Sequence, residues 1–213
     1  MSEKESANRF DMLAANWDEN PVRIQMVRAV ATKMIETVRP DGSMNTLEFG
    51  CGTGLVTVLI APEVRHITAM DSSEKMLSEL QKKIEEMKLI NISCLKGDLV
   101  SETLKDSSFD FIYSNMTYHH IHDGAALLNK LHKALSVNGR LVIADLDLED
   151  GSFHTDMAGV HHPGFLRSDV VSAFERAGFS HCAIMDAHTI EKKEENGKVR
   201  RYSMFLAFGT KEA

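Results

Sequence analysis

The chain has 213 residues, 43% of them hydrophobic, which is sufficient for one domain with a substantial core. Its net charge of −7 argues against nonspecific binding to nucleic acid. No apolar stretch is as long as a membrane span, and the charged first thirty residues lack the apolar core of a signal peptide. Because Cys51, Cys94 and Cys182 are few and scattered, they favour a reducing compartment. We therefore expect a single domain over residues 1–213 that is cytoplasmic and binds neither nucleic acid nor membrane.

Residues 1–40 are predicted to form an N-terminal helical cap. Val22, Met26, Val30 and Met34 recur at helical spacing and predict one helix with an apolar face. Trp17 precedes this helix and has two interpretations. It is either a core aromatic residue or part of a segment that covers a binding site.

Residues 41–146 alternate short strand-like runs with longer helical patterns, which is typical of βαβ units and a parallel sheet. The expected strands are residues 45–49, 66–70, 92–96, 110–114 and 140–146. The expected helices are residues 55–61, 72–89 and 124–137. Asn138 and Gly139 form a left-handed cap signal, which is expected to end the last of these helices.

Residues 147–213 are predicted to form a substrate loop, a helix and a terminal hairpin. The loop of residues 147–165 is polar and rich in histidine, and long loops of this kind are often binding loops. A helix is expected over residues 167–179, begun by Ser168. Asn196-Gly197 is a hairpin signal between two strand-like runs, so we expect an antiparallel addition to the sheet.

The stretch LEFGCGTGL places three glycines, Gly50, Gly52 and Gly54, between an expected strand and an expected helix. A bare turn of this kind lets the backbone approach a ligand closely, although a tight turn without a ligand is the simpler alternative. The dinucleotide pattern G-x-G-x-x-G requires a third glycine where this chain has Leu55, and the P-loop lysine is missing. The loop therefore matches neither phosphate-binding motif.

Two acidic residues follow the next two expected strands. Asp71 lies 21 residues after Gly50, where a carboxylate can accept hydrogen bonds from ribose hydroxyls. Residues 71–74 also match a capping box, so Asp71 is alternatively a helix cap. Asp98 and Leu99 follow the third strand, where they could contact adenine, or Asp98 could be a turn residue.

The ordered motifs resemble those of class I S-adenosylmethionine-dependent methyltransferases, in the group that modifies small molecules. The resemblance covers residues 48–54, Asp71, residues 97–99, 109–115 and 135–145, and extends to residues 10–20 and 174–179. It implies a Rossmann-like, doubly wound α/β fold with a mostly parallel seven-stranded sheet, an antiparallel last strand and helices on both faces. It also implies S-adenosylmethionine as cofactor, S-adenosylhomocysteine as product and a small-molecule acceptor. The residues expected to bind the cofactor are Glu48, Gly50, Cys51, Gly52, Gly54, Asp71, Ser72, Asp98, Leu99 and Asn115. We expect Glu48 nearest the cationic methionine portion.

The acceptor is expected beside the end of the fourth strand, where the chain reads SNMTYHHIHDG (114–124). Methyl transfer requires alignment, and it requires a base only if the acceptor loses a proton. His119 and His120 are therefore candidate catalytic bases, although histidines at strand ends are often packing residues. Trp17, Tyr118, His154 and His161 are expected to line the substrate pocket.

No spacing of histidines and cysteines matches a known metal site, so no metal is expected. Adenine-modifying relatives carry Asn-Pro-Pro-Tyr where this chain has Asn115-Met-Thr-Tyr118, which further disfavours a nucleic-acid substrate. Two other hypotheses stay open: a nicotinamide-dinucleotide oxidoreductase, and a regulatory protein that binds the cofactor without turnover. The oligomeric state is also left open by these patterns.

Overall fold

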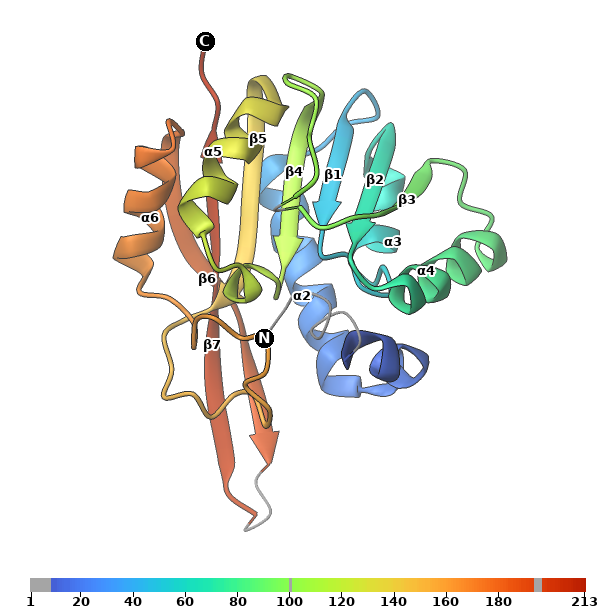
Figure 1. Ribbon diagram of the computed structural model, residues 1–213, viewed down its shortest axis with the longest axis vertical. Coiled ribbons are helices and arrows are strands. Elements are labelled where there is room, and N and C mark those ends of the chain that lie inside the picture. The colour runs from blue at the N-terminus through green and yellow to red at the C-terminus, as the bar shows by residue number, and fades with distance from the viewer. Residues whose placement is uncertain (1–8, 100, 194–196) are drawn as a thin grey trace.

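The computed structural model describes residues 9–99, 101–193 and 197–213 as one seven-stranded sheet flanked by helices (Figure 1). The strand order is β3-β2-β1-β4-β5-β7-β6. The strands are β1 (Asn45–Phe49), β2 (His66–Asp71), β3 (Ile92–Lys96), β4 (Phe109–Asn115), β5 (Leu135–Leu146), β6 (Ser180–Lys193) and β7 (Val199–Thr210).

The helices of the described residues include five α-helices and three short 3-10 helices. The α-helices are α2 (Pro21–Val38), α3 (Thr57–Ile60), α4 (Glu74–Glu86), α5 (Gly124–Ala134) and α6 (Arg167–Arg176). The 3-10 helices are η1 (Ala14–Glu19), η2 (Ala61–Glu63) and η3 (Tyr118–His120). Residues 9–13 are also helical. None of the helices in the described part of the chain has the length and apolar character needed to cross a bilayer.

The sheet is parallel from β3 through β5, and β7 runs antiparallel to both β5 and β6. This arrangement confirms the predicted Rossmann-like fold with an antiparallel strand near its end. After β1 the chain moves to β2 and β3, and it then returns to place β4 on the other side of β1. Ligands of open α/β sheets bind where the strand order reverses in this way, at the carboxyl ends of the strands.

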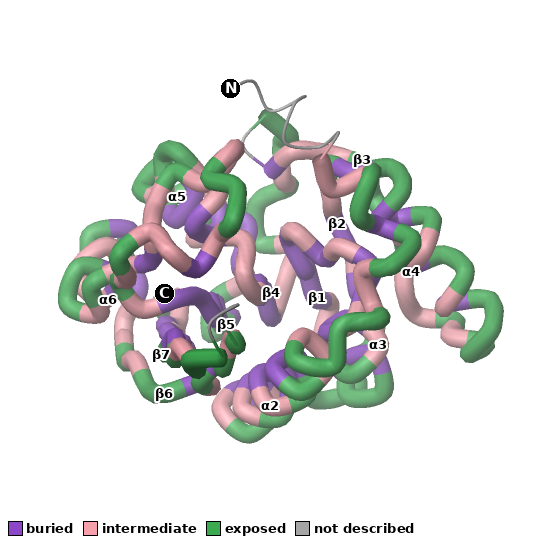
Figure 2. The backbone as a smooth tube through the Cα atoms, turned by 90° about the horizontal axis from the view of Figure 1, so that it is seen from below, coloured by how far each residue is buried: buried purple, intermediate pink, exposed green. Residues whose placement is uncertain are grey.

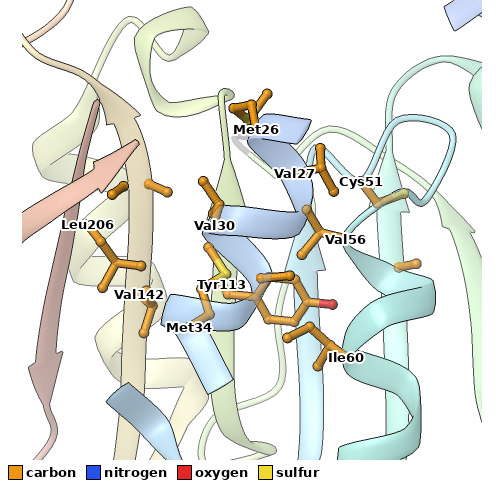
Figure 3. Packing of buried hydrophobic residues seen from close by; sticks show 14 of the residues in the cluster. Met26, Val27, Val30, Met34, Cys51, Val56, Ile60, Tyr113, Val142 and Leu206 are labelled. Carbon is orange, nitrogen blue, oxygen red and sulfur yellow. The ribbon is translucent and has the colours of Figure 1, made fainter. Parts of the chain in front are cut away.

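Two apolar layers hold the helices on the sheet. Helices α2, α3 and α4 cover one face, where Val30 and Met34 of α2 pack near Ile60 and Tyr113 (Figure 3). Helices α5 and α6 cover the other face through residues such as Leu128 and Phe174. The tube view shows the buried segments concentrated on the sheet strands and on the inward sides of these helices (Figure 2).

The predicted boundary between α5 and β5 differs from the structure. Helix α5 ends at Ala134 rather than Val137, because Leu135 already pairs with Phe109 at the start of β5. Asn138 has a φ of 66°, but it lies within β5, where its amide bonds to the Lys211 carbonyl. Its left-handed conformation therefore belongs to an irregularity of the strand rather than to a helix cap.

Helix α6 begins at Arg167 without a side-chain cap, so the predicted capping role of Ser168 is wrong. The guanidinium of Arg167 instead pairs with Asp147 and Asp186. In the predicted hairpin, Asn196 lies outside the described residues, and Gly197 has a φ of 82°. The antiparallel pairing of β6 with β7 is as expected.

Candidate active site

A cavity of about 480 Å³ lies at the carboxyl ends of β1 to β4, at the point where the strand order reverses. It combines segments that are far apart in the chain, from the N-terminal helical segment to β6. Of the residues predicted for the site, those that line it are Trp17, Glu48, Gly50, Cys51, Gly52, Asp71, Ser72, Asp98, Leu99, Asn115, His119, His120, His154 and His161. The cofactor residues and the acceptor residues predicted from sequence therefore share one cavity.

Gly54 and Tyr118, which were also predicted for the site, are not among the residues that line the cavity. A Cβ at Gly54 would lie 2.2 Å from Cδ1 of Leu80, so this glycine allows α4 to pack against the loop. Tyr118 is buried and stacks on Phe165 with ring centroids 4.9 Å apart. Burial, together with the nearby carboxylates, raises the pKa of Tyr118 to about 12, so its hydroxyl stays protonated in the core.

Gly52 is the glycine of the loop that faces open space. It has a φ of 54°, and a Cβ at this position would meet no atom within 4 Å. Its N–H donates to Oδ2 of Asp71 over 2.7 Å, which fixes the loop against the end of β2. The exposed backbone at Gly52 can thus approach a ligand. Gly50 and Gly54 are glycines for another reason, because a Cβ at either position would collide with a packed side chain.

Asp71 braces the loop rather than capping the following helix. The N-cap of α4 is Ser73, whose hydroxyl accepts from the Met76 amide. The carboxylate of Asp71 accepts from the amides of Gly52 and Ser73, over 2.7 and 2.8 Å. Burial raises the pKa of Asp71, and these backbone hydrogen bonds oppose that rise.

Glu48 lies at the base of the cavity with only 2% of its surface exposed. The hydroxyls of Thr57 and Tyr113 both donate to Oε2, the latter over 2.8 Å. Burial raises the pKa of Glu48 to about 8, although these two hydrogen bonds oppose the shift. A cation placed beside this carboxyl group would favour its charged form.

His119 and Asp145 form a buried pair beside the cavity. Nδ1 of His119 lies 2.7 Å from Oδ1 of Asp145, and the His119 amide donates to Oδ2 over 3.1 Å. Because the buried carboxylate can only accept there, Nδ1 carries a proton, and in the neutral imidazole the lone pair is on Nε2. Nε2 is buried and has no hydrogen-bond partner among the described residues.

His120 and His154 extend this pair into a cluster of imidazoles. The ring of His119 lies 4.2 Å from that of His120 and 4.9 Å from that of His154, measured between centroids. Nδ1 of His120 lies 2.6 Å from the Gly159 carbonyl. Burial and the neighbouring His119 lower the pKa of His120 to about 4 and that of His154 to about 3. Both rings are thus neutral at pH 7, and His120 is the weaker candidate for a base.

Within the described part of the chain, no group of three or more His, Cys, Asp and Glu side chains is arranged to hold a metal ion. The imidazole cluster can instead take part in proton transfer and form part of the cavity wall.

The N-terminal segment closes one side of the cavity. Asp18 accepts from the hydroxyl of Thr53 over 2.6 Å, which ties η1 to the glycine loop. Arg9 reaches the loop after β5, where its guanidinium donates to the carbonyls of Asp156 and Ala158. Trp17 is among the residues that line the cavity in this arrangement.

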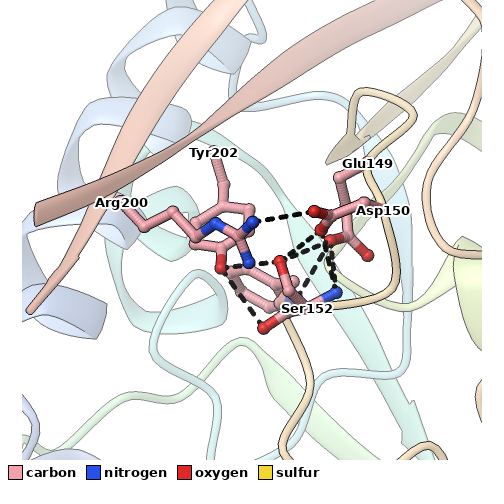
Figure 4. Close-up of polar contacts among 6 residues, drawn as sticks. Glu149, Asp150, Ser152, Arg200 and Tyr202 are labelled. Carbon is pink, nitrogen blue, oxygen red and sulfur yellow. Dashed lines mark hydrogen bonds and ion pairs between the residues drawn. The ribbon is translucent and has the colours of Figure 1, made fainter. Parts of the chain in front are cut away.

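The histidine-bearing loop of residues 147–165 is held at both ends. Near its start, Ser152 contacts the Tyr202 hydroxyl and Asp150 pairs with Arg200, which fastens the loop to β7 (Figure 4). Further along, the amides of His161 and His162 donate to the His119 carbonyl over 3.0 and 3.1 Å. The loop therefore positions the residue that carries the free imidazole nitrogen.

Several residues of the site were not predicted from the sequence. Asp145 does not line the cavity but holds His119 from behind, and this contact depends on the pairing of β4 with β5. Arg9, Arg23 and Lys192 line the cavity, and they come from the N-terminal segment, α2 and β6. The sequence around each of these three residues is typical of an exposed or helical surface. Nothing in it predicts that their side chains line the cavity.

Comparison with known proteins supports the interpretation of this fold. Residues 47–143 match the family model described as a methyltransferase domain. An "uncharacterized methyltransferase" of Schizosaccharomyces pombe is 30% identical over 159 residues, which cover 67% of this chain and 55% of that protein. A demethylmenaquinone methyltransferase of Listeria welshimeri is 26% identical over 114 residues, covering 52% of this chain and 48% of that protein. The chain thus spans about half the length of these two relatives.

A solved S-adenosylmethionine-dependent methyltransferase from Aquifex aeolicus shares the fold, with a TM-score of 0.66 and 19% identity. The match covers 96% of this chain and 98% of that one. The strand order and the cavity at its reversal define a Rossmann-like methyltransferase fold. With the family match and the ordered motifs, the chain belongs to the class I S-adenosylmethionine-dependent methyltransferases.

Proposed function

We propose that this protein transfers a methyl group from S-adenosylmethionine to a small-molecule acceptor by in-line displacement. The observation that carries the proposal is the free Nε2 of His119, which lies in the cavity wall while Asp145 holds the other side of the ring. The cavity volume of about 480 Å³ is in the range of small-molecule sites.

The residues of the cavity fit the proposed cofactor. Glu48, Asp71 and Asp98 line it from the ends of three neighbouring strands, and they supply acceptors for a cationic amino acid, a ribose and an adenine amino group. Gly52 leaves the backbone open beside Asp71. When bound, the cofactor supplies an electrophilic methyl group on a sulfonium. The chain contributes binding, alignment and exclusion of water.

His119 is proposed as the general base for an acceptor that loses a proton. Its Nε2 takes the proton, and the carboxylate of Asp145 stabilises the resulting imidazolium from the opposite side of the ring. Asn115 lies nearby on the same strand end, and its amide oxygen has no hydrogen-bond partner in the described part of the chain. It is therefore proposed to bind either the cofactor or the acceptor.

Incubation with S-adenosylmethionine labelled in its methyl group and a panel of small metabolites tests this function. We expect label in at least one acceptor, with one S-adenosylhomocysteine formed per transferred methyl. If S-adenosylmethionine binds but no acceptor is labelled, the protein is instead a cofactor-binding regulator. Preferential stabilisation by NAD over S-adenosylmethionine would favour a dinucleotide enzyme.

A further inference from the structure

The cavity is divided by charge. The acidic residues that line it are Glu48, Asp71 and Asp98, all at the ends of β1 to β3, which we call the carboxylate side. The basic residues that line it are Arg9, Arg23 and Lys192, which we call the cationic side. Among the described wall residues, no carboxylate belongs to the cationic side. The two ends of the cavity therefore favour ligand groups of opposite charge.

The cationic side is connected to the proposed base by a series of ring contacts. Nζ of Lys192 lies 3.7 Å from the ring centroid of Phe153, and that ring lies 4.8 Å from His154. His154 in turn contacts His119, and its Nε2 is buried with no hydrogen-bond partner among the described residues. His119, His154, Phe153 and Lys192 thus follow one another along the lining of the cavity.

Lys192 is the member of this group with the greatest free capacity for an anion. Arg9 already pairs with Asp156, and Arg23 donates to the Trp17 carbonyl while its guanidinium stacks on the indole 3.7 Å away. Lys192 donates to the Phe153 carbonyl, but no carboxylate of the described residues forms an ion pair with it. An ammonium group has two further protons to donate.

Charged groups of both signs surround Lys192. Burial lowers the pKa of Lys192, Glu149 opposes this shift, and Arg23 adds to it. Oε2 of Glu149 accepts from the amides of Ser152 and Phe153, whereas its Oε1 is buried without a hydrogen-bond partner among the described residues. Arg200, opposite Lys192 across the β6–β7 ladder, is paired with Asp150. Lys192 is therefore the cation at this end that keeps donors for an anionic ligand group.

We propose that the methyl acceptor is a small acid, with its anionic group bound by Lys192 and its reacting, proton-bearing atom beside His119. The body between these two ends is apolar or aromatic, because Phe10, Trp17 and Phe153 line the cavity and the ring of Phe10 contacts those of Trp17 and His120. That the bound acid is a methyl acceptor rests on the proposed methyltransferase function. The anion site itself depends only on the arrangement of Lys192.

Matched pairs of ligands that differ only in charge test the anion site. The probes are 4-hydroxybenzoate against 4-hydroxybenzamide, and indole-3-acetate against indole-3-acetamide. Binding is measured by calorimetry on the protein alone and on the protein saturated with S-adenosylhomocysteine. We expect at least one acid to bind about tenfold or more tightly than its amide, since a charge-assisted hydrogen bond has roughly that effect.

Variants assign this preference to one side chain. Lys192→Met keeps the length of the side chain and removes its charge, so it should abolish the preference for the acid. Lys193→Met is the matched control, because Lys193 is the exposed neighbour on the same strand and does not line the cavity. Equal binding of acid and amide, or a preference that survives in Lys192→Met, overturns the proposal. Failure of S-adenosylhomocysteine to bind contradicts the proposed function, while the acid measurements on the protein alone still decide the anion site.

Discussion

The imidazole of His119 and the carboxylate of Asp145 meet between two adjacent strand ends, with Nδ1 and Oδ1 2.7 Å apart and both side chains buried. The pairing of Asn115 with Ala144 brings the ends of β4 and β5 together and so places Asp145 beside η3. This contact fixes the tautomer of the neutral His119 ring and leaves Nε2 without a hydrogen-bond partner among the described residues. It distinguishes His119 from the adjacent His120, which has a backbone carbonyl as its partner.

Replacing His119 by Asn should slow methyl transfer strongly while preserving the fold. The Asn amide can still donate to Asp145, but it offers no basic nitrogen to the cavity. General-base catalysis contributes roughly 10²- to 10⁴-fold, so we expect a loss of kcat in that range with nearly unchanged affinity for S-adenosylhomocysteine. His120→Asn is the matched control and should retain most of the activity. Equal losses in both variants would contradict the assignment of the base.

Replacing Asp145 by Asn should reduce both activity and stability. Asp145 accepts from Nδ1 and the amide of His119 and from the amide of Leu146. Both carboxylate oxygens are therefore acceptors, and the side-chain nitrogen of Asn would face a donor whichever oxygen it replaced. We expect a loss of about 1–3 kcal/mol in the free energy of unfolding, measured by urea denaturation. A variant as stable as the wild type would argue against the hydrogen bonding described for this carboxylate.

The same carboxylate predicts a contribution to acid stability. The hydrogen bonds and proximity to His119 lower the pKa of Asp145 below its usual 3.8, against the opposing effect of burial. A lowered folded-state pKa stabilises the fold above the unfolded-state value, and this contribution is lost as the pH falls through the folded value. The unfolding temperature of Asp145→Asn should therefore fall less steeply than that of the wild type below pH 4.

Glu48 predicts the opposite dependence on pH. Its folded-state pKa of about 8 exceeds the usual 4.5, so between these values the folded protein holds a proton that the unfolded chain has lost. Stability should therefore decline as the pH rises from about 4.5 to 8, by about 1.4 kcal/mol per unit at most from this group. Glu48→Gln should remove that slope. Equal declines of the two unfolding temperatures between pH 6 and 8 would rule out the proposed titration.

Glu48 should also couple proton release to binding. A cationic methionine portion beside the carboxyl group favours ionisation, so S-adenosylhomocysteine, which retains the ammonium group, should displace a proton near pH 7. Calorimetry in buffers of different ionisation enthalpy measures this release, which Glu48→Gln should abolish. Binding without proton release in the wild type would place the cation elsewhere.

The glycine loop predicts two distinct phenotypes. Gly52→Ala adds a methyl group at a φ of 54° in open space beside the cavity, so we expect weaker binding of S-adenosylhomocysteine and a stability loss of about 1 kcal/mol. Gly54→Ala places a methyl group against Leu80, so we expect mainly a lower unfolding temperature. If Gly54→Ala weakens binding more than Gly52→Ala at similar stability, the assignment of the two glycines is reversed.

The sequence predicted the sheet and the carboxylate side well because those signals are local. A glycine turn follows one strand, and an acidic residue follows each of the next two strands, so chain order alone places them at one edge. The choice between His119 and His120 required the register of β4 and β5, since Asp145 lies 26 residues from His119. Lys192 and Arg23 reach the cavity from β6 and α2, which pack together only in the folded chain. Asn138 and Gly139 misled the prediction because a left-handed residue can also interrupt a strand.

Titration of the purified protein with S-adenosylhomocysteine tests the central claim most directly. We expect binding at one site per chain with a dissociation constant below about 100 μM, which corresponds to roughly 5.5 kcal/mol or more of binding free energy. Absence of binding at millimolar ligand would contradict the assignment of the cavity.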